Sequence, residues 1–180
     1  MPGPPTLFPP SLLPASLPSS LPPGYALRPL ARDDHGRGFF ACLEEVLTWV
    51  GDPTEAEFRA RYDEMADARG TYYFAVIEHA GRVVGTGCLV VEKKLIHNCT
   101  KVGHVEEIAV SAAHQGKGLG RAMMRALDGV ARAVGCEKSV LNCGPRNEAF
   151  YAGCGYRNSG IEMTREFVGG EGGEEVGGGQ

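Results

Sequence analysis

The segment with the clearest chemistry in this 180-residue sequence is a glycine-rich turn, which reads Gln-Gly-Lys-Gly-Leu-Gly over residues 115–120. Glycines let several backbone N–H groups point into one concavity, and the N-terminus of a following helix adds positive potential, so such a turn can hold phosphate. Its spacing differs from a Walker loop, which ends in Lys-Ser or Lys-Thr, and from the G-x-G-x-x-G pattern of dinucleotide-binding folds. A tight structural turn without a ligand is the alternative interpretation.

Two adjacent acids, Glu106 and Glu107, precede this turn in a strand-like run that ends Ile-Ala-Val at residues 108–110. Neighbouring side chains on a regular strand point to opposite faces. We therefore expect that these two carboxylates do not form a pair. One is expected to meet a substrate, while the other serves the structure or the second face of the site. The alternative for either is a solvated charge at the end of a strand.

The patterns around these residues predict an α/β fold with a mixed central β-sheet and helices on both faces. Apolar residues recur at helical spacing over residues 39–50, 53–68 and 119–134, and a short helix is expected over 147–154. For the second helix we expect Asp52 as N-cap, Pro53 at the first position and Glu55 completing a capping box. Strands are expected over residues 25–28, 72–78, 82–92, 103–110, 138–143 and 161–167, the second and third forming a hairpin.

Both ends of the chain differ in composition from its middle. Nine of the 12 prolines lie in residues 1–23, and seven of the 26 glycines lie in residues 169–180. We therefore expect a disordered Pro/Ser/Leu-rich leader over residues 1–24, one domain over 25–168 and a disordered Gly/Glu tail over 169–180. The leader lacks the basic start and the continuous apolar stretch of a secretory signal. Organelle targeting and peripheral membrane association are the alternatives for it.

Charge and cysteine content exclude several classes of protein. Without the tail the chain has 18 basic and 19 acidic residues, a balance that gives no electrostatic footprint for nucleic acid. Its apolar runs are too short to span a bilayer. The six cysteines show neither C-x-x-C nor metal-site spacing, so we expect no metal and reduced thiols in a cytoplasmic compartment.

Read with its neighbours, the glycine-rich turn resembles the acyl-CoA-binding motif of the GCN5-related N-acetyltransferase (GNAT) superfamily, Gln/Arg-x-x-Gly-x-Gly/Ala. The run at 106–110 before it and Asn-Glu-Ala-Phe-Tyr at 147–151 after it fit the same superfamily. The resemblance implies that acetyl-CoA lies between two splayed parallel strands, here about residues 105–110 and 139–143. It assigns acetyl-CoA binding to Ile108, Ala109, Val110, Gln115, Gly116, Lys117, Gly118, Leu119, Gly120, Arg121, Asn147 and Tyr151.

Within the superfamily, residues 25–167 resemble the branch that acetylates glucosamine 6-phosphate. The resemblance rests on Leu-Thr-Trp-Val-Gly at 47–51, Glu-Lys-Lys-Leu-Ile-His at 92–97, Gly-His-Val-Glu-Glu-Ile-Ala-Val at 103–110 and the segment 147–156. It implies acetylation of the sugar's 2-amino group, a step toward UDP-N-acetylglucosamine, by a homodimer in which residues 137 and 138 reach in from a second subunit. It assigns substrate binding to Thr48, Lys94, Leu95, Ile96, His97, Glu106, Glu107, Ile108, Glu137, Lys138, Asn142 and Arg165.

The same resemblance gives Tyr151 the role of stabilising or protonating the departing thiolate, and it places Glu106, Glu107 and Asn142 beside the reacting amine. It supplies no clear side-chain base, which leaves water or a backbone carbonyl as candidates. Two positions depart from the branch. Asn142 stands where relatives read Leu-Asp-Cys, and an amide holds a positive amine less well than a carboxylate does. Arg165 lies near a basic phosphate contact of relatives, but Glu166 falls there in the alternative alignment.

Two other functions compete with this one. The first is a GNAT-fold acetyltransferase that acts on a protein N-terminus or another small amine, which would require an open groove. The second is a binding protein that keeps its affinity for CoA but has lost turnover, and Asn142 is its one supporting feature. The string at 94–97 and the two adjacent acids favour the sugar phosphate.

Overall fold

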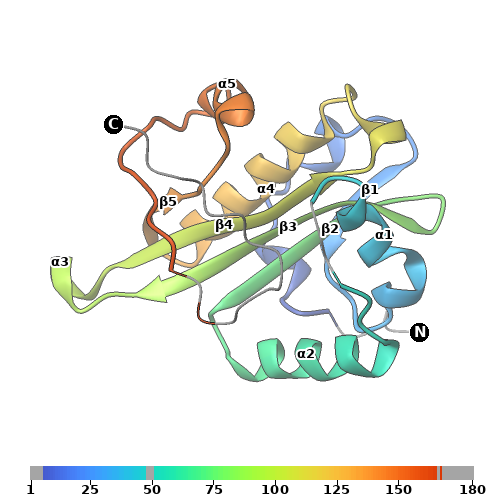
Figure 1. Ribbon diagram of the computed structural model, residues 1–180, viewed down its shortest axis with the longest axis horizontal. Helices are drawn as coiled ribbons and strands as arrows, with labels where there is room; N and C mark the ends of the chain where they lie inside the picture. Colours follow the sequence, from blue (N-terminus) through green and yellow to red (C-terminus); the bar gives the residue numbers. More distant parts are fainter. Residues whose placement is uncertain (1–5, 48–50, 166, 168–180) are drawn as a thin grey trace.

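A five-stranded sheet in the order β1-β2-β3-β4-β5 forms the centre of the computed structural model, which describes residues 6–47, 51–165 and 167 (Figure 1). Neighbouring strands run antiparallel except β4 and β5, which are parallel. The predicted mixed sheet is thereby confirmed. Its strands are β1 (Tyr25–Pro29), β2 (Tyr72–His79), β3 (Arg82–Lys93), β4 (Lys101–Val110) and β5 (Cys136–Val140).

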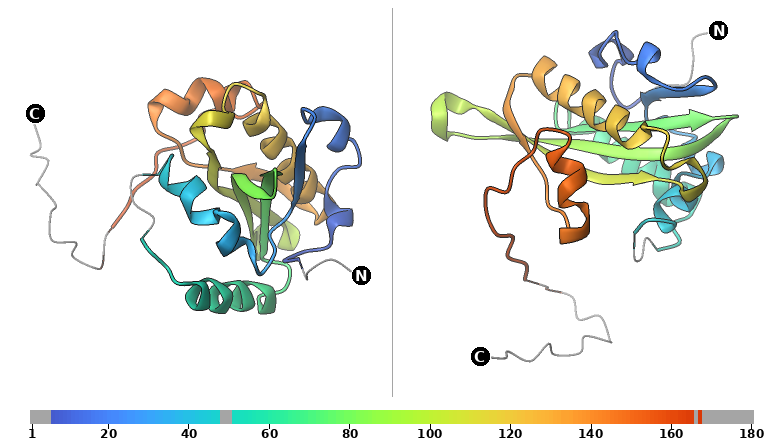
Figure 2. Two further views of the ribbon diagram at one scale, coloured as in Figure 1. Left: turned by 90° about the vertical axis from the view of Figure 1, so that its right-hand side faces the viewer. Right: turned by 90° about the horizontal axis from the view of Figure 1, so that it is seen from above.

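Helices cover both faces of the sheet, as predicted (Figure 2). On one face α4 (Leu119–Ala133) buries an apolar stripe against β2, β3 and β4, which we call the α4-side core. On the other face α1 (Phe39–Glu44) and α2 (Glu55–Asp67) form the α1-side core. Two shorter helices lie outside these layers: α3 (Ile96–Cys99) at the tip of the β3–β4 hairpin and α5 (Glu148–Ala152) after β5. Over the described residues, no helix is long and apolar enough to cross a membrane.

Several predicted boundaries are wrong. The first helix ends at Glu44 rather than near residue 50, and residues 48–50 lie outside the described part. The N-cap of α2 is Thr54 rather than Asp52, because Thr54 and Glu57 complete a capping box: Thr54 N–H donates to Glu57 Oε2 (2.8 Å) and Glu57 N–H donates to Thr54 Oγ1 (3.3 Å). The last predicted strand is absent, since residues 161–165 and 167 are exposed and unpaired by any described strand.

Disorder of the whole leader is also a wrong expectation, because residues 6–24 pack against the domain. Phe8 and Leu17 are only 4% and 5% exposed, and the Phe8 ring lies 5.5 Å from the Tyr73 ring. Thr6 forms a β-bridge with Ala31, and two short 3-10 turns, Pro10–Leu12 and Pro18–Ser20, follow it. The prolines favour open turns, but the apolar residues between them bury surface on α4 and β2. Sequence composition alone detects the turn-forming prolines and misses the burial of the apolar residues between them.

Replacing Phe8 with Ala tests whether this segment belongs to the fold. Loss of a buried aromatic ring typically costs about 3 kcal/mol of unfolding free energy. We expect a loss of this size in denaturant unfolding, with Ser11→Ala, an exposed residue of the same segment, unchanged. Equal stability of the two variants would contradict the packing of the leader on the core.

Candidate active site

The two parallel strands separate halfway along β4. Pairing runs from Lys101 opposite Cys136 to His104 opposite Val140 and then stops, while β4 continues to Val110. Beyond His104 the chain after β5 turns toward α5 instead of following β4 (Figure 1). The second half of β4 therefore has a free edge on that side among the described residues. This is the predicted splay, and we call the region between the separated strand ends the cleft.

The glycine-rich turn closes one end of this cleft. The side-chain amide of Gln115 donates to the carbonyl of Val110 (2.9 Å), which ties the turn to the end of β4. Gly116 and Gly118 have φ of 74° and 79°, a region that residues with a Cβ disfavour, and no atom lies within 4 Å of where a Cβ would stand. Lys117 Nζ donates to Ala113 O (3.0 Å) and to the Tyr25 hydroxyl (3.2 Å), and it pairs with no carboxylate of the described residues. Open backbone, a helix N-terminus and an uncompensated ammonium group together suit a phosphate.

The last residues of the turn serve packing more than ligand binding. Leu119 is 1% exposed and belongs to the α4-side core. A Cβ on Gly120 would lie 3.2 Å from Phe150 Cζ, so this glycine lets α5 pack on the first turn of α4. Arg121 is exposed on the same turn. Among these three, only backbone N–H groups and the Arg121 side chain are available to a ligand.

The acids at the middle of β4 lie at an irregularity of the strand, so regular alternation does not continue through them. Cys88 pairs with Glu106 and Thr86 pairs with Ala109, so two residues of β4 oppose one of β3, which defines a β-bulge. Glu107 has φ of 53°. The pKa of Glu107 is raised, first by burial of its carboxyl and then by the charge of Glu106.

Tyr151 reaches the same cleft from α5. It is half-buried against the α4-side core, its ring lies 5.0 Å from the Phe150 ring, and its hydroxyl makes no hydrogen bond with any described residue. Burial raises the pKa of Tyr151, with smaller contributions from Cys143, Cys154 and Glu106. The hydroxyl therefore stays protonated, and a proton donor, at neutral pH.

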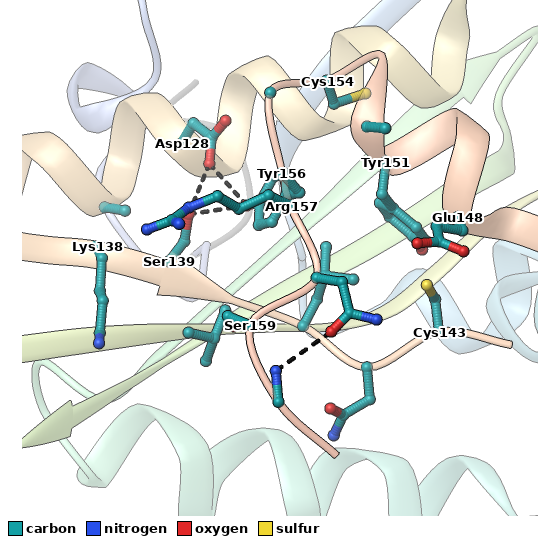
Figure 3. A pocket seen from close by; sticks show the side chains of 18 of the residues that line it. Asp128, Lys138, Ser139, Cys143, Glu148, Tyr151, Cys154, Tyr156, Arg157 and Ser159 are labelled. Atoms are coloured by element: carbon teal, nitrogen blue, oxygen red, sulfur yellow. Dashed lines mark hydrogen bonds between the residues drawn. The ribbon is translucent and has the colours of Figure 1, made fainter. Parts of the chain in front are cut away.

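A cavity of about 990 Å³ lies beyond the outer edge of β5, between that strand, α5 and the segment 157–162 (Figure 3). Tyr151, Glu148 and Cys143 gather at one end of it, and Lys138 lies at the other. Of the predicted residues, Glu137, Lys138, Asn142 and Tyr151 line it. Asn142 does not face the β4 acids in this chain, because its amide donates to Glu162 Oε1 (2.8 Å).

Other predicted residues lie elsewhere. The string at 94–97 occupies the tip of the β3–β4 hairpin, which projects from the far end of the sheet (Figure 1). There Lys94 donates to Glu92 Oε1 (2.6 Å), and this bond, with one from His104, lowers the pKa of Glu92. Arg165 is exposed and stacks on Phe167. Asn147 lies in the turn before α5, and Thr48 falls outside the described residues. The predicted substrate-binding residues therefore do not lie together within one chain.

Sequence reasoning missed a hydrogen-bonded cluster that fixes β5. Ser139 Oγ and the Tyr156 hydroxyl both lie within bonding distance of Asp128 Oδ1 (3.0 and 2.9 Å) and 2.8 Å from each other. The cluster joins α4, β5 and the chain after α5, and burial raises the pKa of Tyr156. Tyr156 lies in the segment 147–156, on which the resemblance partly rests. Its hydrogen-bond partners are 17 and 28 residues away in the sequence, so no local pattern reveals them. Among the described residues no His, Cys, Asp or Glu group of three is arranged to hold a metal.

Fold and cleft together define the class of protein. Residues 39–156 match the model of the acetyltransferase (GNAT) family, and the chain belongs to that family. It is similar to glucosamine 6-phosphate N-acetyltransferase of Candida albicans, with 43% identity over 148 residues, 82% of this chain and 99% of that protein. The enzyme of the same name from Arabidopsis thaliana is 34% identical over 145 residues, 79% of this chain and 97% of that protein.

Solved structures agree with this assignment. The crystal structure of glucosamine-6-phosphate N-acetyltransferase from Arabidopsis thaliana aligns with a TM-score of 0.77 and 32% identity, over 80% of this chain and 99% of that one. An acetyltransferase of Trypanosoma brucei aligns with a TM-score of 0.72 and 26% identity, over 79% and 99%. The chain is an acetyltransferase with the GNAT fold.

The raised pKa of Glu107 gives a pH-dependent prediction. A carboxyl whose pKa is raised by folding favours the folded state while it is protonated, and this stabilisation is lost as the pH rises through the raised pKa. Glu107→Gln removes the charge, so we expect a higher melting temperature than wild type at pH 8 and little difference at pH 4. Thermal unfolding across this range measures it, with the surface variant Glu44→Gln as control. A difference that does not change with pH would show that the carboxyl is not destabilised in the fold.

Proposed function

We propose that this chain transfers the acetyl group of acetyl-CoA to the 2-amino group of glucosamine 6-phosphate. The observation that carries the proposal is the similarity to enzymes of that name over nearly their whole length, 99% of the Candida albicans protein. The cleft fits it, because an open phosphate-compatible turn stands at one end and two acids with a free tyrosine hydroxyl stand in the middle. The product would serve UDP-N-acetylglucosamine synthesis.

Acetyl transfer needs three things of the protein. The amine nitrogen must reach the thioester carbonyl as a neutral group, the carbonyl oxygen must be stabilised as it becomes negative, and the sulfur must be stabilised as the C–S bond breaks. We assign acetyl-CoA to the turn at 115–121 and to the free edge of β4 at residues 108–110. The backbone N–H groups of that edge suit the carbonyl oxygen. The Tyr151 hydroxyl suits the sulfur, because it has no other partner among the described residues and remains protonated.

Proton balance requires that the ammonium lose one proton before attack, and that the nitrogen lose a second as the amide forms while the thiolate gains one. Glu107 is suited to accept the first, since its raised pKa makes it a better base than an ordinary glutamate. Tyr151 is suited to protonate the thiolate, and its phenolate would then take up the proton that the nitrogen loses. Glu106, the neighbour of Glu107, is suited to hold the amine by charge. Asn142 is bonded to Glu162 in this chain and contributes only once that bond is exchanged.

We also propose that two copies complete the substrate site. Ile161 and Met163 are 94% and 93% exposed, in a segment that no strand of the described chain pairs. An unpaired strand edge and exposed alternating apolar residues favour association with another chain. β5 offers such an edge, and Leu95 at the hairpin tip is a further exposed apolar residue, at 91%. A second copy would supply the tip at 94–97, the residues Glu137 and Lys138, or both, to a cleft that lacks them.

A cytoplasmic location completes the proposal. All six cysteines are free in the structure, although Cys143 and Cys99 are exposed to solvent, and a reducing compartment keeps exposed thiols in that state. The domain is proposed to include the described part of the leader from residue 6 onward, because this part packs on the core. Segment 169–180 is proposed as a tail outside it.

The assay that tests the function measures CoA release from purified protein with acetyl-CoA and glucosamine 6-phosphate. Unphosphorylated glucosamine and a peptide with a free N-terminus distinguish the alternatives. We expect turnover that requires the sugar phosphate. Turnover with the peptide alone would establish a different acetyltransferase, and CoA binding without any turnover would establish a binding protein.

Tyr151→Phe tests the assigned role of the hydroxyl. A positioned proton donor typically contributes about 100-fold or more to rate, so we expect kcat to fall by about that factor while the affinity for CoA stays near wild type. Tyr156→Phe is the matched control, since it removes bonds to Ser139 and Asp128 and should lower the melting temperature with a much smaller effect on kcat. Equal kcat in Tyr151→Phe and wild type would show that the hydroxyl takes no part in the reaction.

The double variant Ile161→Asp/Met163→Asp tests the dimer. Two buried charges in an apolar interface oppose association, so we expect a monomeric mass in light scattering and a loss of sugar-phosphate turnover with CoA binding retained. Ala60→Asp, on the exposed face of α2, is the control and should leave both unchanged. Monomeric wild-type protein with full activity would contradict the proposal.

A further inference from the structure

The bulge in β4 has a specific support on the neighbouring strand. Glu107 lies in the left-handed region, φ 53°, where the Cβ of an ordinary residue is strained. Such a conformation persists only where surrounding contacts hold it. Thr86 on β3 supplies the contact: its side chain is fully buried, 0% exposed, and its Oγ1 donates to the carbonyl of Glu107 at 2.9 Å.

A glycine next to Thr86 makes room for the same distortion. Gly87 is the single residue of β3 that stands opposite both Glu107 and Ile108. A Cβ at Gly87 would lie 2.7 Å from Ile108 Cδ1 and 2.8 Å from Met123 Cγ, so any larger residue would displace Ile108 from the α4-side core. The pair Thr86-Gly87 thus provides both the bond and the space that the bulge requires.

The bulge changes the face of the sheet on which the side chains of β4 lie. Val105, Ile108 and Val110 all pack on the α4-side core, whereas Ala109 packs on the α1-side core. Regular alternation would separate Val105 from Ile108, so one extra residue has been inserted between them. Cys88, in the α1-side core, has its pKa raised by burial and then by the charges of Glu107 and Glu106. Both acids therefore lie within electrostatic reach of that side.

The hydrogen bond from Thr86 to the Glu107 carbonyl also sets the direction of the next backbone N–H group. The peptide bonds of the described residues are all trans, and in a trans peptide the C=O and N–H of one plane point in opposite directions. The carbonyl of Glu107 points at Thr86 on β3. The N–H of the same plane, which belongs to Ile108, therefore points away from β3, on the side of β4 from which β5 has separated.

We propose that Thr86 is a positioning residue for acetyl transfer: by holding the Glu107 carbonyl, its hydroxyl aims the Ile108 N–H into the cleft and keeps Glu107 in the bulge. This inference rests on the proposed acetyl transfer. Thr86 touches no reacting atom itself. Its effect reaches the reaction through one backbone amide, suited to the thioester oxygen, and through the base assigned above.

Thr86→Val and Thr86→Ser separate this role from simple packing. Valine keeps the shape of threonine without the hydroxyl, whereas serine keeps the hydroxyl. Because misplacing one donor for a developing oxyanion costs about 100-fold in kcat, we expect a fall of that order in Thr86→Val with a much smaller change in the KM for acetyl-CoA. Thr86→Ser should recover kcat to within a few-fold of wild type. Should the valine variant not fold, Thr86→Ala takes its place.

Val91→Ala is the matched control, because it perturbs a buried residue of β3 away from the bulge, 3% exposed and opposite Gly103. It should lower the melting temperature without a comparable fall in kcat. A fall in Thr86→Val no larger than in Val91→Ala, or an equal fall in Thr86→Ser, would overturn the positioning role.

A second measurement does not depend on turnover. Carbon NMR of the Glu107 carboxyl through a pH titration reports whether the bulge survives, and the groups that face this carboxyl are Glu106 and Cys88. We expect its pKa to fall toward the ordinary glutamate value in Thr86→Val and to stay raised in Thr86→Ser. An unchanged pKa in Thr86→Val refutes the inference. Wild-type protein without turnover would instead refute the proposed function and leave the titration to decide on Thr86.

Discussion

A single extra residue in β4 is the constraint on which the site depends. An uninterrupted strand would keep regular alternation past Glu106, and its acids would face opposite layers of the domain. The bulge at Glu107 breaks that alternation while the strands on the other side, β2 and β3, remain locked by two buried cores. Strain at one backbone position is tolerable because packing on both faces leaves the rest of β4 no freedom to relax it.

The separation of β4 from β5 is the complementary feature. Four residue pairs hold the strands together at one end, and the Asp128–Ser139–Tyr156 cluster anchors β5 to α4 just as pairing stops. The anchor lets the chain after β5 diverge without loosening the sheet. The unpaired half of β4 then has backbone groups available to a ligand, which explains why an acyl-transfer site can rest on main-chain donors instead of side chains.

The sequence predicts the parts of this arrangement whose signals are local. The hairpin at residues 72–92 and the helix after the glycine-rich turn are correct because periodicity and turn residues determine them, whereas the parallel pair was implied by the resemblance to the GNAT superfamily. The bulge was not predicted, since its cause is a bond between Thr86 and Glu107, 21 positions apart, and adjacent acids look like ordinary alternation. The leader failed for the opposite reason: proline content predicts disorder, but burial of Phe8 and Leu17 depends on a surface that exists only after folding.

Exposed apolar surface and an incomplete site occur at the same places in this chain. Leu95 and Ile96 stand beside Lys94 and His97 at the hairpin tip, while Ile161 lines the cavity and exposed Met163 follows it two residues later. In an isolated chain these apolar side chains stay exposed to water and contribute no burial free energy, and the edge of β5 stays unpaired. Association of two copies through these surfaces would remove both costs at once and bring basic residues to a cleft that has acids and a tyrosine but few cations. Stability and substrate recognition would then depend on the same interface, so selection for one would maintain the other.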